Sequence, residues 1–526
     1  MRKGLLVLAL LALAPASAQR LVVAQGTDPI TLDAPLAQDS PSATVVTHIS
    51  ETLFELTPEG RIVPLLAEGH SFADGGRTLV IRLKRGITFH DGTPFNAEAV
   101  KFNLERFVSR ELASPFAFLL SELERVEVVD TYTVRLRLKN PFAPILAHLT
   151  HSSTAMQSPA AIQRLGAQYR DNPVGTGPYR FQAWQKGQFV DLVRNENYWG
   201  EKPPIPQVRF IPVPEGTTRV ALVETGQAHV AVRIPPQDIA RLQANRAIEV
   251  VRTPSLRTIY IYFNTQRPPF NDARVRQALN YAVNKEEILQ FVLGGIGRIS
   301  DAPIAPGIFG YAPVGRYEYN PQRAQELLRQ AGITLPLRVT LHCPTGRYFQ
   351  DIQVCEAIQG QLRRVGVEAS IQTLEWGAYL QETQRPLREN RIQMAMLGWG
   401  TVTGDADYGL YPLFHSSQWA PGFNRAFYRN PRVDQLLAQA RISTLPQGRQ
   451  QLYREAMTQI WQDAPWLFLH SELQVQAITG PDCLQGFRGG ELPCQEHRWV
   501  PWGQAHHEED QKNHSEEGRD SNEKAP

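Results

Sequence analysis

A short stretch in the last third of the chain carries the residues best suited to hold a charged solute. Gly404, Asp405 and Asp407 follow a nearly continuous apolar run that ends at Gly398 and Trp399. Such a run is typical of a strand buried on both faces, and open α/β sheets bind ligands outside the carboxyl ends of their strands. Two carboxylates among aromatic side chains would make a cation receptor. The alternative is local, because Asp405 or Asp407 could also cap the following helix.

The segments that would position this stretch alternate between strands and helices. We expect strands over residues 337–341 and 367–374 with a helix over 351–365 between them, and a further strand over the apolar run at 392–397. A β-α-β order of this kind predicts a parallel sheet in the second half of the chain. The first half instead shows alternating patterns over 78–84 and 126–138, which predict hairpin strands. A Gly- and Pro-rich break at 172–179 predicts a passage between domains.

Length and composition point to a globular protein of several domains. The chain has 526 residues, too many for one core, with 42% hydrophobic and 20% charged residues. Its formal net charge is only +2. That balance favours neither nucleic acid nor an anionic membrane as a partner.

The first residues predict export. Arg2 and Lys3 precede an apolar core over 5–14, and the small residues 16–18 form a cleavage site. Residues 1–18 are therefore expected to be a secretory signal peptide, with the mature chain starting at Gln19. No Cys follows the predicted cut, so we expect no lipid anchor there. At the other end, residues 504–526 are polar and are expected to be a disordered tail, in which two adjacent His could hold a metal weakly.

Four cysteines remain in a chain expected to be exported, where disulfides can form. Cys483 and Cys494 flank a Gly-rich stretch and are expected to form a bridge. For Cys343 and Cys355 the spacing leaves two alternatives open, a bridge or two buried thiols.

Several blocks, in order and over nearly the whole mature chain, resemble extracellular solute-binding protein family 5. Its members are the dipeptide-, oligopeptide-, glutathione- and nickel-binding receptors of ABC importers. The blocks that carry the resemblance are residues 62–68 with 79–86 and 89–92, residues 174–179 with 194–200, residues 263–264 with 269–279, and residues 320–332.

The resemblance implies an α/β fold with two lobes that clamp a ligand, of the cluster C type, with an extra α/β domain inserted in the first lobe. Lobe I would comprise residues 19–45, 173–264 and 481–503, and the extra domain residues 46–172. Lobe II would comprise residues 265–480. The crossings between the lobes are expected near 173–177 and 263–266.

The closest similarity is to the dipeptide-binding branch, and it implies roles for particular residues. That branch has Gly-Asp-Pro-Asp where this chain has Gly404-Asp405-Ala406-Asp407, and its first Asp holds the α-ammonium of the ligand, which implies Asp405 here. An Arg-Pro-Tyr that meets the ligand carboxylate corresponds to Arg347 and Tyr348, without the Pro. Trp376 and the Gly-Trp at Trp399 also match. For Arg347 the alternative is a surface residue in a polar turn.

The sequence therefore predicts a periplasmic receptor that delivers a peptide-like solute to the transmembrane subunits of an ABC permease. We expect it to be a monomer without cofactor, and not an enzyme. Ser71 lies in a near miss of the GxSxG pattern, which leaves a secreted hydrolase as the rival class. Within the family, a nickel or haem receptor and an oligosaccharide receptor are the alternatives, the last because several Trp could stack on sugars.

Overall fold

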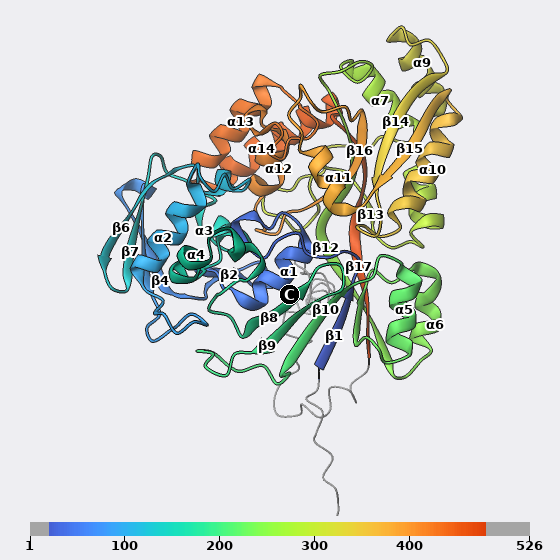
Figure 1. Ribbon diagram of the computed structural model, residues 1–526. Coiled ribbons are helices and arrows are strands. Elements are labelled where there is room, and N and C mark those ends of the chain that lie inside the picture. The colour runs from blue at the N-terminus through green and yellow to red at the C-terminus, as the bar shows by residue number, and fades with distance from the viewer. Residues whose placement is uncertain (1–19, 480–526) are drawn as a thin grey trace, which may run out of the picture.

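The computed structural model describes residues 20–479 (Figure 1). The predicted signal peptide, the predicted Cys483–Cys494 bridge, the last segment of lobe I and the polar tail lie outside these residues.

One sheet of eleven strands extends through both lobes. Its strands, in spatial order, are β15 (Val367–Leu374), β14 (Leu337–Pro344), β16 (Met394–Gly400), β12 (Ile248–Phe263), β17 (Trp466–Thr479), β11 (Val230–Val232), β1 (Arg20–Gln25), β10 (Gln207–Pro212), β9 (Phe189–Arg194) and β8 (Tyr179–Gln185), with β13 (Arg298–Ile299) paired to β17.

In lobe II the predicted parallel arrangement is present, since β14 pairs in parallel with both β15 and β16. The apolar run forms β16, but this strand continues to Gly400 because Gly398 to Gly400 pair with β12. The polar loop that was expected after Trp399 therefore starts at Thr401. The helices of this lobe are α7 (Ala273–Ala282), α8 (Lys285–Glu287), α9 (Pro321–Gln330), α10 (Asp351–Arg363), α11 (Trp376–Thr383), α12 (Ala406–Phe414), α13 (Pro431–Ile442) and α14 (Pro446–Asp463).

In lobe I, β1 lies in parallel between β10 and β11. One face of these strands packs on α1 (Ser40–Ile49), whose buried Val45, Val46 and Ile49 join Leu192 and Phe210 in a separate small core. Two further helices, α5 (Gly216–Glu224) and α6 (Pro236–Gln243), lie beside β11 and β12 (Figure 1).

The two long strands β12 and β17 join the lobes. The last residues of β17 pair with β11 in lobe I, and residues 257–263 of β12 pair with β16 in lobe II. The register between β12 and β17 shifts between Pro254 and Thr258. The crossing on β12 therefore lies before the position expected near residues 263–266, and its partner is a strand rather than a loop.

The extra domain has a sheet of its own, seen at the left of Figure 1 in blue and teal. The alternating patterns at 78–84 and 126–138 form strands of this sheet, as predicted. Its elements are β4 (Ala67–Ala73), β5 (Thr78–Leu83), β7 (Thr133–Leu138) and β6 (Leu123–Asp130) in spatial order, with α2 (Ala97–Val108), α3 (Ile145–His148), α4 (Pro159–Leu165) and the hairpin β2 (Phe54–Leu56) and β3 (Ile62–Pro64).

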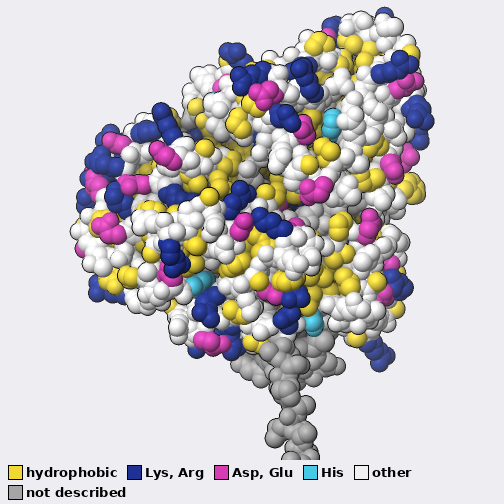
Figure 2. All heavy atoms as spheres, in the orientation of Figure 1, with side chains coloured by type: hydrophobic (Ala, Val, Ile, Leu, Met, Phe, Trp, Pro, Cys, Tyr) yellow, Lys and Arg dark blue, Asp and Glu magenta, His cyan; other side chains and the backbone are white. Residues whose placement is uncertain are grey.

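The Gly- and Pro-rich break at 172–179 leads from the extra domain into β8 of lobe I. Its glycines allow the backbone to approach the end of α1, since a Cβ on Gly175 would lie 2.2 Å from the carbonyl oxygen of Ile49. The fold is thus the predicted two-lobed α/β clamp with an inserted domain. Charged side chains of both signs are spread over the face seen in Figure 2, in line with the small net charge. Across residues 20–479, no helix is long and apolar enough to span a bilayer.

Candidate functional site

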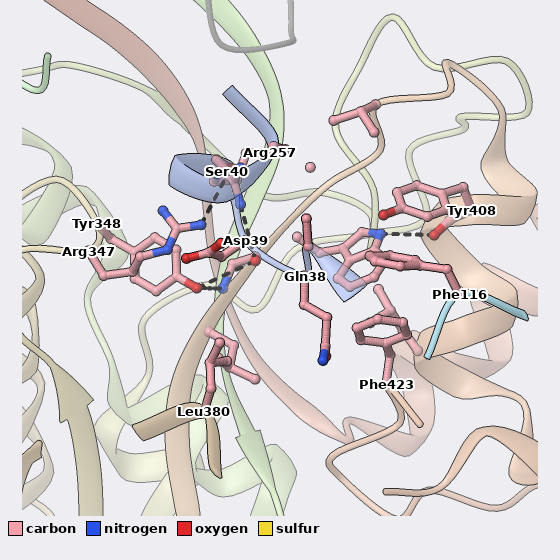
Figure 3. Close-up of a pocket in the computed structure, with 18 of the residues that line it drawn as sticks. Gln38, Asp39, Ser40, Phe116, Arg257, Arg347, Tyr348, Leu380, Tyr408 and Phe423 are labelled. Carbon is pink, nitrogen blue, oxygen red and sulfur yellow. Dashed lines mark hydrogen bonds between the residues drawn. The ribbon is translucent and has the colours of Figure 1, made fainter. Parts of the chain in front are cut away.

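A cavity lies where the two lobes and the extra domain meet, and Figure 3 shows its lining. Lobe I contributes the segment that leads into α1, and the extra domain contributes Phe116 and His151. The remaining wall comes from β12 and from the loops and helices of lobe II. Of the seven residues predicted for the site, four line this cavity, namely Arg347, Tyr348, Trp376 and Trp399.

Arg347 lies in the loop between β14 and α10, and its side chain is buried, with only 2% of the residue exposed. The loop is fixed because the backbone N–H groups of Arg347 and Tyr348 donate to one Asp351 oxygen at 2.8 and 3.0 Å. A disulfide joins Cys343 to Cys355 and closes this segment, which settles the alternative left open by the spacing. The alternative of a surface position for Arg347 is therefore excluded.

The Arg347 guanidinium is held by aromatic faces rather than by a carboxylate. Its Cζ lies 4.8 Å from the ring centre of Tyr348 and 4.9 Å from that of Trp376. Such stacking stabilises a cation while leaving its N–H edge free. Among the described residues, Nε and Nη1 have no hydrogen-bond partner, and Nη2 has only Ser40 Oγ at 3.5 Å. The group is thus a buried donor set that points at the cavity.

Arg257, from β12, stands beside it and was not predicted. Its Nη2 donates to the same Ser40 Oγ at 2.7 Å, and its Nε lies 3.3 Å from a Glu472 carboxylate oxygen. Burial lowers the pKa of the Arg257 guanidinium, and the positive charge of Arg347 lowers it further. The two arginines therefore meet at one neutral hydroxyl, and among the described residues only Arg257 has a carboxylate at ion-pair distance.

An aromatic wall faces these cations from the opposite side of the cavity (Figure 3). The Trp399 ring centre lies 4.9 Å from Tyr408 and 4.8 Å from Phe423, and Phe423 lies 5.1 Å from Phe116 of the extra domain. The Trp399 indole N–H donates to the Tyr408 carbonyl at 2.8 Å, which fixes its orientation. This side of the cavity offers stacking surface for an apolar or planar group.

Asp405 and Asp407, together with Gly404, are not among the residues that line the cavity. Asp405 caps α12 by accepting from the Asp407 N–H at 2.9 Å, and its carboxylate also pairs with Arg449 at 2.8 Å. The capping alternative is therefore confirmed. Its role toward a ligand ammonium stays a prediction, and the carboxylate already has a buried cationic partner.

Asp407 is buried between two cationic groups. One oxygen lies 3.2 Å from Arg441 Nε and the other 3.2 Å from His148 Nε2 of the extra domain. Burial alone would raise the pKa of Asp407, but Arg441 and His148 outweigh it and hold the pKa below its usual value. The second carboxylate of the predicted motif therefore connects lobe II to the extra domain.

Asp39 is the carboxylate that the cavity wall does contain. It caps α1, where Ser42 N–H donates to Oδ1 at 3.2 Å, and its Oδ2 accepts from the Trp376 indole N–H at 2.9 Å. The local sequence did not indicate that Asp39 lines the cavity, because its partner Trp376 lies 337 residues further along the chain.

The residues that would support a hydrolase or a metal receptor are not assembled in the described part of the chain. Ser71 lies in the exposed strand β4 of the extra domain, far in sequence and in place from the cavity wall. Between residues 20 and 479 no three His, Cys, Asp or Glu residues are grouped so that they could hold a metal.

The model of bacterial extracellular solute-binding proteins, family 5, matches residues 61–421. The chain belongs to this family. It is 35% identical to a glutathione-binding protein GsiB of Pectobacterium atrosepticum, over 90% of this chain and 95% of that protein. It is 36% identical to GsiB of Escherichia coli, over 93% and 99% of the two chains.

Solved structures of the family agree. The periplasmic binding protein DppA of Helicobacter pylori, in complex with the peptide STSA, matches with a TM-score of 0.83 and 27% identity over 88% of this chain and 94% of that chain. A dipeptide-binding protein of Pseudoalteromonas in complex with Met-Leu matches with a TM-score of 0.82 and 25% identity over 88% and 96%. This family consists of solute receptors.

Proposed function

We propose that this protein is the receptor of an ABC importer that captures a peptide-like solute and delivers it to the permease. The observation that carries the proposal is Arg347, a buried guanidinium with unpartnered N–H groups in a cavity between two lobes. A planar guanidinium pairs with a carboxylate in bidentate fashion, and peptides present a carboxylate at one end. The relatives named for glutathione and for peptides support the same class of solute.

A receptor of this kind performs no chemistry on its solute. The described cavity walls present donors, acceptors and aromatic faces, which suit them to hold a solute. Transport would be driven by the ATPase subunits of the importer, on other chains.

Titration calorimetry with a panel of solutes tests the proposal. The panel contains dipeptides, tripeptides, glutathione, cello-oligosaccharides and Ni²⁺. We expect binding of at least one peptide-like compound. Binding of Ni²⁺ or of an oligosaccharide alone would replace the peptide proposal.

Calorimetry on the variant Arg347→Gln, with the same panel of solutes, tests the role of Arg347 in binding. Losing one partner of a buried charge pair costs about 2–5 kcal/mol, so affinity should fall by about 30-fold to several-thousand-fold. Arg388→Gln is the matched control, because that arginine has a side chain that is 83% exposed. Equal affinities of the two variants would exclude Arg347 from the site.

We further propose export to the periplasm by the predicted signal peptide. The family places its members outside the cytoplasmic membrane, and residues 1–18 have the charge, apolar core and small residues of a cleavable signal. Mass spectrometry of the protein recovered from the periplasm should find Gln19 as the first residue. A mature chain that keeps Arg2 and Lys3 would contradict this.

A further inference from the structure

Within residues 20–479, three charged groups in the cavity wall have no oppositely charged partner at ion-pair distance. Two are the guanidinium groups of Arg347 and Arg425, and the third is the carboxylate of Asp39. All three residues are buried, with exposed fractions of 2%, 5% and 4%. Burying a charge without a partner is costly, so such groups are either satisfied by polar neighbours or reserved for a ligand.

Arg425 resembles Arg347 in its surroundings. Its Nη1 donates to the backbone carbonyls of Pro421 and Gly422, the first at 3.1 Å, and its Cζ lies 5.5 Å from the Phe423 ring centre. No carboxylate of residues 20–479 lies within 4.0 Å of it. Burial lowers the pKa of the Arg425 guanidinium to about 10, which is what an unneutralised cation should show.

Asp39 is the counterpart of opposite sign. Its carboxylate accepts from two neutral donors, Ser42 N–H and the Trp376 indole, and the described chain offers it no Lys, Arg or His partner within 4.0 Å. Arg347 reaches Ser40, the next residue, so Asp39 and Arg347 border the same part of the cavity (Figure 3).

The other charges around the cavity are paired within the protein. Arg257 has Glu472 at 3.3 Å, Asp405 has Arg449 at 2.8 Å, and Asp407 lies between Arg441 and His148. Arg347, Arg425 and Asp39 thus differ from Arg257, which also lines the cavity, because they lack an ion-pair partner within residues 20–479.

We propose that the solute carries two carboxylates and one ammonium group, with Arg347 and Arg425 as partners of the carboxylates and Asp39 as partner of the ammonium. This inference rests on the proposed function and narrows it to acidic peptide-like solutes. A dipeptide containing Glu has this charge pattern, and glutathione has it as well. A neutral dipeptide would leave one buried guanidinium without its partner.

Peptides that differ in a single charge test the proposal on the unmodified mature protein. Glu-Ala and γ-Glu-Ala carry two carboxylates and one ammonium, whereas Gln-Ala has nearly the same shape and one carboxylate. By calorimetry the better acidic peptide should bind about 10- to 100-fold more tightly than Gln-Ala. N-acetylation of that peptide should weaken its binding by a similar factor.

Two variants test which side chain pairs with which charged group of the peptide. Arg425→Gln should reduce the preference for the acidic peptide over Gln-Ala to within about 3-fold, while the control Arg388→Gln keeps it. Asp39→Asn preserves the helix cap, because Asn is an equally good N-cap. It should remove the discrimination against the N-acetylated peptide. Circular dichroism establishes that each variant is folded, and the comparison on the unmodified protein needs no variant.

The outcomes separate this inference from the proposed function. If acidic and neutral peptides bind with equal affinity, the charge pattern is wrong and the peptide receptor stands. If the preference exists but Arg425→Gln leaves it unchanged, the assignment to Arg425 is wrong. If no peptide of the wider panel binds, both proposals fall.

Discussion

Two aspartates in and near the cavity wall have different roles because their neighbours differ. Asp39 faces the cavity with neutral donors only, whereas Asp405 is buried against Arg449 and supports the start of α12. Asp405→Asn would leave a buried Arg449 without its carboxylate. Breaking a buried pair from one side costs about 3–5 kcal/mol, so the free energy of unfolding in urea should fall by that amount. The double variant Asp405→Asn with Arg449→Gln should recover part of it.

A contrary result is equally specific. Asp405→Asn could instead leave the free energy of unfolding unchanged and weaken the binding of free-amine peptides more than that of N-acetylated peptides. In that case Asp405, and not Asp39, holds the ligand ammonium.

Lys285, which does not line the cavity, leads us to predict how the free energy of unfolding depends on pH. Its ammonium is buried and donates to the carbonyls of Asn280 and Tyr317. Burial lowers its pKa to about 7, from 10.5 for an exposed lysine. Between these values the unfolded chain binds more protons than the native one, so stability rises with pH. From pH 7 to 9 this contributes about 2 kcal/mol. The unfolding free energy of Lys285→Met should lack that increment, and parallel pH curves for both proteins would contradict the assignment.

At the residue scale, four of the seven residues predicted from motifs line the cavity, and several other lining residues were not predicted. Arg347, Tyr348, Trp376 and Trp399 line the cavity as expected. Arg425 carries no local signal, because its position depends on how a loop of lobe II folds back over β12. Phe116 belongs to a different domain, and only the assembled fold brings it to Trp399 and Phe423.

At the scale of elements, the disulfide between β14 and α10 closes the loop that presents Arg347. Cys343 and Cys355 are 12 residues apart in sequence, and a loop of about that length is stabilised by about 3 kcal/mol when it is cross-linked. The double variant Cys343→Ser with Cys355→Ser should therefore unfold at lower urea concentration. Peptide affinity should fall as well, because the Arg347 loop would have to be ordered on binding. Unchanged affinity would mean that Asp351 alone fixes the loop.

Secondary structure was predicted well where periodicity and caps are strong. The strands and the helix predicted over 337–374 are present in the structure. The crossing between the lobes was misplaced, because β12 and β17 each continue through both lobes as long strands. A strand that changes partners along its length has no local sequence feature at the crossing other than Pro254, beside the shift in register.

At the scale of the whole molecule, the extra domain and lobe II are in contact around the cavity. His148 lies against Asp407, the His151 ring meets the Tyr408 hydroxyl at 2.8 Å, and Arg441 donates to the Phe118 carbonyl at 2.7 Å. Within residues 20–479, the extra domain and lobe II share no sheet, so these side-chain contacts join them directly. These contacts between the extra domain and lobe II are polar and buried.

Closure gives the last prediction. A two-lobed receptor moves about its hinge on the μs–ms timescale, and a ligand that contacts both lobes favours the closed form. Asp39 comes from lobe I and Arg347 from lobe II, so a solute that binds both should bring the lobes together. Small-angle scattering should show a smaller radius of gyration when the tightest-binding peptide of the panel is saturating. The variant His148→Gln removes a closing contact outside the cavity wall, so it should weaken peptide affinity several-fold while the bound radius stays small. A radius that does not change with saturating peptide would show that the solute binds without closure, and His148→Gln would then leave the affinity unaltered.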